Sequence, residues 1–271
     1  MKYLIISLLC FLFSIIGFTQ TVNRIVSLAP SLTMNVYYLE SKQKLVGCTS
    51  YCEIAKPDKK EIIGSIVTVN IEKIVSLKPD LVIATSITKP AVIDKLRKMG
   101  IRVEVFSSPK NFEAICEEFL HLGTLIGKTE KAKAVIAESK AKVEKIKASH
   151  KTAKKSKVFF QIGADPIFSV LSNTFMNDYI LYCGGVNIAA DLKSGSIGRE
   201  SVLQRNPDVI FIITMGITGD EEKKIWLNYP ELTATKKKQI FIIDSNLACT
   251  PTPVSFVQTL EIVNKLLSSQ K

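Results

Sequence analysis

The first half of the chain alternates short apolar runs with amphipathic segments. The apolar runs have the length of buried strands and cover residues 24–28, 45–48, 80–84 and 102–106. The segments between them have helical spacing and cover residues 31–39, 71–77 and 88–99. Ser31 can cap the first of these helices, and Pro90 lies in the first turn of the third. Strands that alternate with helices in this way predict parallel β/α units.

The second half repeats this alternation after a long helical stretch. Helical spacing extends from about residue 111 to residue 153, and we expect a break near Gly127. Further strands are expected at residues 158–162, 208–213 and 239–243, and further helices at residues 173–183, 200–205 and 251–267. The sequence therefore predicts an α/β protein whose two halves are separated by helix.

Residues 70–83 and residues 198–211, which lie 128 positions apart, form an internal repeat. In both copies a glutamate, Glu72 or Glu200, begins a short helix, a Pro-Asp pair follows, and a buried strand comes next. A Pro-Asp pair by itself can end a helix before a strand. It does not explain why a glutamate occupies the same place in both copies.

The N-terminus has the layout of a secretory signal peptide. Lys2 supplies a short basic region, a mostly apolar run covers residues 4–18, and small or polar residues follow. This run is shorter than the ~20 residues that a membrane-spanning helix needs. We expect residues 1–19 to be cleaved off, which makes the mature protein soluble and periplasmic; an uncleaved anchor is the alternative. Cys10 lies inside the apolar run behind two leucines, so a lipoprotein is not expected.

Composition and charge are those of a globular protein with one basic helix. Hydrophobic residues make up 46% of the chain and charged residues 23%. The net charge of +11 is concentrated in residues 128–157, which contain eleven lysines and three glutamates at helical spacing. This pattern is typical of a solvated helix face. The whole chain has five arginines and this segment has none, so we expect no nucleic-acid binding.

Five cysteines remain once the signal peptide is removed, and they are Cys48, Cys52, Cys116, Cys183 and Cys249. An odd number leaves at least one thiol unpaired. The spacing of Cys48 and Cys52 resembles half of a metal site, but no second half exists and the only histidines are His121 and His150. No metal site is therefore expected, and the pair is either a local disulfide or two small buried residues.

Enzyme motifs are incomplete in this sequence. Residues 123–129 resemble a phosphate-binding loop, but three residues separate the glycines where that motif needs four, and no strand precedes it. No nucleophile elbow and no dinucleotide-binding glycine pattern after a strand are found. We therefore expect no enzyme and no intrinsic cofactor. A sensor or adhesion module is a further alternative, which requires an anchor or an effector region.

Several motifs, taken in order, resemble one family. They are the start at residues 24–31, the Gly-Cys-Thr-Ser-Tyr-Cys segment at residues 47–52, the two Glu…Pro-Asp units, the Cys-Gly-Gly-Val-Asn-Ile segment at residues 183–188, and the closing helix with its prolines. Over essentially all of the mature chain, this set is similar to the helical-backbone substrate-binding proteins of ABC importers. That group delivers cobalamin, ferric siderophores and haem.

The resemblance implies two Rossmann-like β/α lobes joined by one long α-helix. The implied parts are an N-terminal lobe at residues 20–127, a linker helix at residues 128–155 and a C-terminal lobe at residues 156–271. A helical linker is stiff, so the lobes are expected to move little. The protein is expected to be a monomer that delivers its ligand to a dimeric ABC permease. By motif position, Glu72 and Glu200 are implied to lie on the outside of the two lobes and to pair with permease arginines.

The resemblance also implies a ligand site between the lobes. Ser31 and Ser86 are in loops expected at the carboxyl ends of strands, where α/β lobes bind ligands. Tyr51 matches a tyrosine that touches the corrin ring in cobalamin-binding relatives, although a loop tyrosine packed at the lobe edge is the alternative. A second contacting loop of those relatives is matched by Asn246, Leu247, Ala248, Cys249 and Thr250. This segment lacks the aromatic and charged residues of the cobalamin-binding loop.

The expected ligand is a small-molecule metal chelate of low net charge. Catecholate siderophores and haem propionates are anionic and are commonly held by arginines. Here Arg199 is the one arginine near a candidate loop, and its neighbour Glu200 places it on the implied docking side. We therefore favour a corrinoid, with a hydroxamate-type ferric siderophore as the next candidate and haem as a third.

Overall fold

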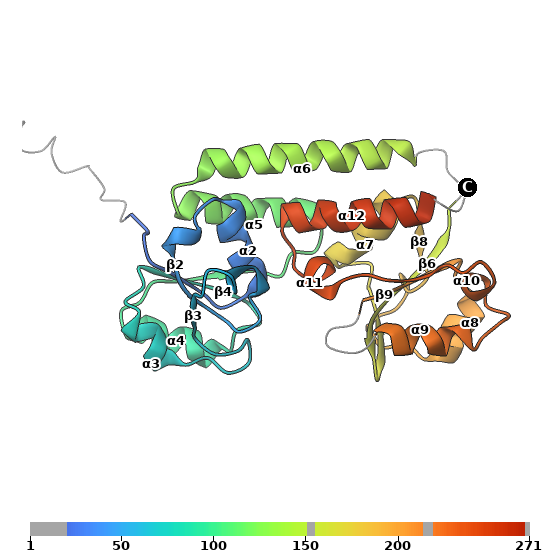
Figure 1. Ribbon diagram of the computed structural model, residues 1–271, viewed down its shortest axis with the longest axis horizontal. Coiled ribbons are helices and arrows are strands. Elements are labelled where there is room, and N and C mark those ends of the chain that lie inside the picture. The colour runs from blue at the N-terminus through green and yellow to red at the C-terminus, as the bar shows by residue number, and fades with distance from the viewer. Residues whose placement is uncertain (1–20, 151–154, 214–218, 269–271) are drawn as a thin grey trace, which may run out of the picture.

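The structure is a computed structural model, and it describes residues 21–150, 155–213 and 219–268. Figure 1 shows two lobes side by side and a layer of three helices, α5, α6 and α12, that runs across them. These helices are Phe112–Leu125, Thr129–Ser149 and Pro253–Ser268. The prediction of an α/β protein with two lobes joined by one long helix is confirmed. The expected signal peptide, at residues 1–19, lies outside the described residues, as do residues 151–154 of the expected linker.

The N-terminal lobe contains a five-stranded parallel sheet with the strand order β3-β2-β1-β4-β5. Its strands are β1 (Ile25–Ser27), β2 (Leu45–Cys48), β3 (Glu61–Ile62), β4 (Leu81–Thr85) and β5 (Val103–Phe106). The connecting helices are α2 (Pro30–Tyr38), η1 (Lys42–Lys44), η2 (Glu53–Ala55), α3 (Ile71–Ser76) and α4 (Pro90–Lys98). Neighbouring residues of one strand, such as Ile25 and Val26, belong to separate apolar clusters. The sheet is therefore covered on both faces, which is why its strands are apolar throughout.

The C-terminal lobe contains a second sheet with the order β10-β9-β6-β7, and β8 pairs with β6. Its strands are β6 (Lys157–Ala164), β7 (Ile167–Ser169), β8 (Val186–Asn187), β9 (Val209–Ile212) and β10 (Ile240–Ile242). Its shorter helices are α7 (Phe175–Tyr182), α8 (Arg199–Arg205), α9 (Gly219–Leu227), α10 (Thr233–Lys236) and α11 (Ser245–Ala248). Strand β7 is antiparallel to β6, and the sequence pattern did not predict this hairpin.

The internal repeat makes equivalent contacts in the two lobes. Asp80 Oδ2 accepts hydrogen bonds from the backbone N–H groups of Asn23 and Arg24, both at 2.8 Å, beside β1. In the second copy Asp208 Oδ2 accepts a 2.9 Å bond from the N–H of Lys157, at the start of β6. The aspartate of each Pro-Asp pair thus fixes the beginning of the neighbouring strand.

The short helix of each repeat also ends in the same way. The residue before each proline, Lys78 or Asn206, has a left-handed backbone with φ of 46° or 43°. Arg24 donates to Leu77 O at 2.7 Å, and Lys157 donates to Arg205 O at 3.1 Å, so a basic side chain satisfies the last carbonyls of both helices. The lobes are therefore related by local contacts as well as by sequence.

The helical layer packs against both lobes, through a separate apolar cluster in each. Residues of α5, α6 and α12 belong to the same cluster as the strands of the C-terminal lobe. The rings of Phe112 and Phe256 are 4.5 Å apart, and those of Tyr179 and Phe256 are 4.7 Å apart. Asp178 Oδ2, on α7, accepts a 2.8 Å hydrogen bond from the N–H of Phe112. The first turn of α5 is therefore anchored inside the C-terminal lobe.

Candidate functional site

The three predicted residues of the N-terminal lobe lie beyond the carboxyl ends of neighbouring strands. Ser31 is in the first turn of α2, directly after β1, and Tyr51 and Ser86 follow β2 and β4. Because β1 pairs with both β2 and β4, the three loops are adjacent at one edge of the sheet. The Tyr51 side chain is 59% exposed, so it is not the packed loop tyrosine of the alternative interpretation.

Hydrogen bonds of the backbone and of serine hydroxyls hold these loops in place. The N–H of Ser50 donates to Gly64 O at 2.9 Å, and the N–H of Glu53 donates to Tyr51 O at 3.0 Å. Ser86 Oγ lies 3.2 Å from Ser108 Oγ, which follows β5. The edge therefore presents hydroxyl groups around one exposed aromatic ring.

The predicted segment of the C-terminal lobe forms α11 and its end. Asp244 Oδ1 caps α11 by accepting a 2.8 Å bond from the N–H of Asn246, and the Thr250 hydroxyl donates to Asn246 O. Asn246 is exposed, whereas Leu247, Cys249 and Thr250 are half-buried. Ala248 is fully buried and packs in the core. Desolvation by burial raises the pKa of Cys249 to about 11, so its thiol stays protonated at neutral pH.

Exposed apolar side chains at the same edges were missed by the sequence analysis. Ile87, next to Ser86, is 71% exposed, and Val67, in the loop after β3, is 67% exposed. On the C-terminal lobe Phe168, on β7, is 41% exposed. A Cβ atom on Gly163 or Gly195 would come within 3.2 Å of the Phe168 ring, so two glycines make room for it.

One surface pocket of about 300 Å³ opens beside these loops, and it is lined by Val105, Ser107, Glu117, Glu118 and His121. His121 Nε2 lies 2.8 Å from Glu104 Oε1, and Glu118 accepts hydrogen bonds from Ser107. None of the predicted ligand residues lines this pocket. Within the described ranges no group of His, Cys, Asp and Glu is arranged to hold a metal ion.

The two predicted docking glutamates are exposed and occupy equivalent places. Glu72 lies in the first turn of α3, where Asn70 Oδ1 caps the helix by accepting a 2.9 Å bond from the N–H of Lys73. Glu200 lies in the first turn of α8, which has no side-chain cap at Gly198. Helix α3 precedes β4 and helix α8 precedes β9, so each lobe presents one of the two repeat glutamates.

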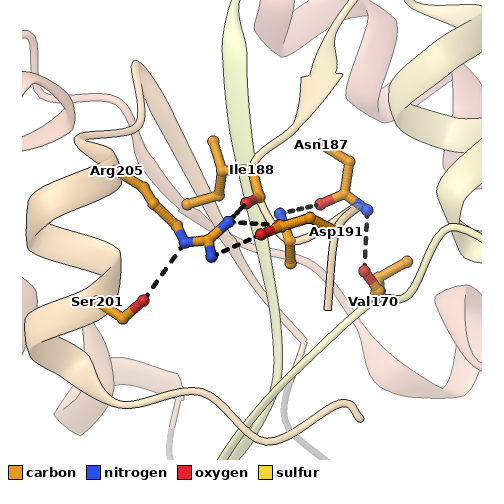
Figure 2. Close-up of polar contacts among 7 residues, drawn as sticks. Val170, Asn187, Ile188, Asp191, Ser201 and Arg205 are labelled. Atoms are coloured by element: carbon orange, nitrogen blue, oxygen red, sulfur yellow. Dashed lines mark hydrogen bonds and ion pairs between the residues drawn. The ribbon is translucent and has the colours of Figure 1, made fainter. Parts of the chain in front are cut away.

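Helix α8 is held at both ends by arginines. At its start, Arg199 binds the buried Glu222 at 3.0 Å and lies over the ring of Trp226 at 4.4 Å. At its end, Arg205 binds Asp191 through two nitrogens, at 2.5 and 3.0 Å, and donates to Ile188 O (Figure 2). Figure 2 also shows Asn187 bound to Val170 O, at 2.9 Å. The Cys-Gly-Gly-Val-Asn-Ile segment thus positions the helix that carries Glu200.

Four of the five arginines bind groups of the chain itself. Arg24, Arg199 and Arg205 make the contacts described above, and Arg97 donates to Val103 O at 3.0 Å. The Arg199 pair is nearly buried, and the side chain of Glu222 is 7% exposed. The candidate ligand loops therefore offer hydroxyl, amide and apolar groups without an arginine fork.

The lysine-rich helix α6 is largely neutralised by its neighbours. Within the helix, Lys133, Lys142 and Lys147 pair with Glu130, Glu138 and Glu144 three or four residues away. Lys131 and Lys140 pair with Glu40 and Glu113 on other helices or loops. Exposed pairs of this kind add little stability, so the lysines serve mainly as a solvated surface.

Comparison with known proteins shows the family to which this two-lobed chain belongs. The family model described as periplasmic binding protein matches residues 25–247, which include both sheets. The chain belongs to the periplasmic binding protein family. No helix among the described residues is long and apolar enough to cross a membrane.

Curated relatives of this periplasmic binding protein include vitamin B12-binding proteins. That of Vibrio parahaemolyticus is 25% identical over 247 residues, which are 90% of this chain and 89% of the relative. That of Yersinia pestis is 28% identical over 212 residues, which are 77% and 75% of the two chains.

Solved structures agree in fold over nearly the whole length. The periplasmic vitamin B12 binding protein of Vibrio cholerae is 26% identical, with a TM-score of 0.79 over 92% of this chain and 98% of the other. A periplasmic haem binding protein of Pseudomonas aeruginosa, 22% identical, has a TM-score of 0.80 over 90% and 91% of the two chains, and this likeness shows the fold alone.

Proposed function

We propose that this protein captures a metal chelate between its two lobes and delivers it to the permease of an ABC importer. A corrinoid such as cobalamin is the favoured ligand. The observation that carries the proposal is Tyr51, the one exposed tyrosine among the described residues, which lies among hydroxyl-bearing loops at the carboxyl edge of the N-terminal sheet. Membership in the periplasmic binding protein family and the vitamin B12-binding relatives support the same ligand class.

The proposed contact set comes from both lobes. From the N-terminal lobe it comprises Ser31, Tyr51 and Ser86. From the C-terminal lobe it comprises Asn246, Leu247, Cys249 and Thr250, while the buried Ala248 supports α11 from within. Aromatic and aliphatic side chains cover the flat face of a large ring, and hydroxyl and amide groups bind its side-chain amides.

The charge of the loops supports a ligand of low net charge. Four arginines are engaged within the chain, so the anionic groups of a catecholate siderophore or of haem propionates lack their usual partners. Corrinoids and hydroxamate-type ferric siderophores have amide-rich surfaces and do not need arginine partners. Between these two, the relatives favour the corrinoid.

Titration calorimetry with purified mature protein tests the ligand. We expect one-to-one binding of cyanocobalamin or cobinamide, and weaker or no binding of haem and ferric hydroxamates. Tight binding of a ferric hydroxamate instead would move the assignment to the siderophore class. Binding of a sugar or an amino acid, with no response to any chelate, would contradict the proposal.

The mature protein is proposed to be a soluble periplasmic monomer that begins near Gln20. The motivation is the basic and apolar pattern at residues 1–19, together with the family. Delivery is proposed to depend on Glu72 and Glu200, because the two exposed carboxylates have equivalent places in the two repeats. A twofold pair of carboxylates suits a twofold-symmetric partner with arginines.

A further inference from the structure

Two cysteines lie beneath the loop that carries Tyr51. Cys48 is the last residue of β2, and Cys52 precedes the first turn of η2. Their side chains are buried, with 1% and 3% of their surfaces exposed. Between them Ser50 and Tyr51 are exposed. The two buried cysteines therefore lie at the two ends of a short loop whose middle residues face solvent.

Cys48 and Cys52 belong to the same buried apolar cluster, and the N–H of Cys52 donates to Thr49 O at 3.1 Å, which closes the turn between them. Thr33 Oγ1 lies 3.1 Å from Cys52 Sγ, and Thr49 Oγ1 lies 3.3 Å from it. Hydrogen bonding with Cys48, aided by these hydroxyls, lowers the pKa of Cys52, whereas the same interaction raises the pKa of Cys48. Cys52 is thus the thiol of the pair that ionises first.

The other three cysteines have different surroundings. Cys116 and Cys183 belong to the apolar cluster of the C-terminal lobe, and Cys249 packs against that cluster. Desolvation by burial raises the pKa values of Cys116 and Cys183 to about 12. These thiols behave as small apolar side chains. Cys48 and Cys52 differ from them because they are near neighbours in the sequence and because two threonine hydroxyls lie close to Cys52 Sγ.

We propose that Cys48 and Cys52 form a disulfide during export, and that this bond fixes the loop of residues 49–51. The oxidant is an external protein or small-molecule disulfide, which an oxidising compartment supplies. The Cys52 thiolate attacks one sulfur of that disulfide and expels the other as a thiolate. The Cys48 thiolate then attacks the Cys52 sulfur of the mixed disulfide and expels the second thiolate. The pair loses two electrons, and its two protons pass to the departing thiolates.

The local spacing makes this pair suited to early oxidation. Three residues separate the cysteines, so the sulfurs meet by closing a short loop and need no long-range folding. Exchange takes place as this loop closes, and the completed fold then packs around the bond. The odd number of cysteines is accounted for as well, because the remaining three stay reduced in the core.

The loop is the link to ligand binding, and this part rests on the proposed function. A disulfide closed across residues 48–52 removes conformational freedom from Tyr51 before the ligand arrives. Preorganisation of a binding group improves affinity by reducing the entropy lost on binding. We expect reduction of the bond to weaken cyanocobalamin binding about threefold to tenfold, which corresponds to ordering one or two side chains.

Peptide mass spectrometry decides whether the bond exists. The full chain is collected from the periplasm, acid-quenched, and alkylated with N-ethylmaleimide under denaturing conditions without reductant. We expect the peptide with Cys48 and Cys52 to be unalkylated and lighter by two hydrogen atoms, while Cys116, Cys183 and Cys249 are alkylated and serve as internal controls. Alkylation of both Cys48 and Cys52 as free thiols would overturn the proposal.

Hydrogen exchange tests the effect on the loop without any ligand. In wild-type protein treated with a phosphine reductant, and in the Cys48→Ser/Cys52→Ser variant, we expect faster amide exchange at residues 49–52. The Cys116→Ala variant is the matched control and should exchange there like the untreated protein. Unchanged exchange after reduction would refute the loop-fixing role, and the mass result stands on its own even if no chelate binds.

Discussion

Tyr51 exposes more than half of its side chain, although large aromatic residues are commonly buried. Its loop is held by two backbone hydrogen bonds, from the N–H of Ser50 to Gly64 O and from the N–H of Glu53 to Tyr51 O. A ring fixed in this way loses little entropy when a flat ligand stacks on it. The residue therefore has the properties of a binding platform.

The Tyr51→Ala variant tests this platform. Loss of a stacked aromatic ring removes about 1 kcal/mol beyond the lost contact area, so cyanocobalamin binding should weaken at least about fivefold. The Tyr51→Phe variant keeps the ring and is the matched control, with affinity within about twofold of the wild type. Calorimetry measures both, and equal affinities for the Ala and wild-type proteins would remove Tyr51 from the site.

Residue-level expectations from the sequence were partly testable by the structure. The places of Ser31, Tyr51 and Ser86 beyond neighbouring strands follow from β/α order, because parallel strands end at one edge. The burial of Ala248 could not be foreseen, because it depends on the path of a loop. Phe168 was missed because β7 has three residues, too few to show an alternating pattern.

Helix α5 begins in the C-terminal lobe although its chain belongs to the N-terminal half. Its first N–H groups have no partner within the helix, and Asp178 supplies one for Phe112 from α7. Tyr182 adds a hydrogen bond to the same carboxylate, and Lys147 lies 4.9 Å from the centre of the Tyr182 ring. This contact couples three helices at one buried position.

The Asp178→Ala variant should be destabilised, because it leaves the Phe112 N–H buried without an acceptor. The expected loss is about 1–3 kcal/mol in the free energy of unfolding, measured by denaturant titration. The Asp178→Asn variant keeps an acceptor oxygen and should lose less. If both variants were as stable as the wild type, α5 would not depend on this contact.

The same residue gives a pH dependence of known sign. Desolvation by burial raises the pKa of Asp178 in the folded protein above its value in the unfolded chain. The folded state therefore binds the proton more tightly, and this residue's contribution to stability falls as pH rises through the raised pKa. The free energy of unfolding should therefore decline as pH rises between the unfolded-state and the folded-state pKa of Asp178. The Asp178→Asn variant should lack this contribution to the decline, as measured by denaturant titrations at several pH values.

Most of the main strands and helices were predicted, and most of the elements that were missed are short. The strand at residues 45–48 and the break near Gly127 between α5 and α6 agree with the structure. The sequence pattern does not predict β3, β8, α10 or α11, which have two to four residues each, or the nine-residue helix α9. Such elements are defined by contacts with distant strands or by one cap, and a local pattern does not carry that information.

At the scale of the whole molecule, the two repeats place one exposed glutamate on each lobe. The equivalent contacts of Asp80 and Asp208 give the two helices similar settings against their sheets. Because the helical layer packs against both lobes, we expect the distance between the lobes to change little. Two carboxylates at a fixed separation can recognise a symmetric partner more selectively than either could alone.

The Glu72→Ala and Glu200→Ala variants test docking in reconstituted vesicles. Each should lower uptake, and the double variant should nearly abolish it, since truncating one partner of a desolvated ion pair costs about 2–5 kcal/mol. Glu231→Ala, another exposed glutamate change on the C-terminal lobe, is the control and should transport normally. Cobalamin affinity of the isolated double variant should stay within about threefold of the wild type. Normal uptake by the double variant would end the docking hypothesis.

The packing of α12 on α5 has a consequence for the order in which the chain can fold. Phe112, Ile115 and Cys116 of α5 are covered by Phe256 and Leu260 of α12, the final helix of the described chain. Because a chain is synthesised from its N-terminus, α5 emerges long before α12, which covers it. Apolar surface left open in this interval favours aggregation. We therefore expect the vulnerable period to last until α12 has emerged, and we expect a holding chaperone to bind the open face of α5 during that period.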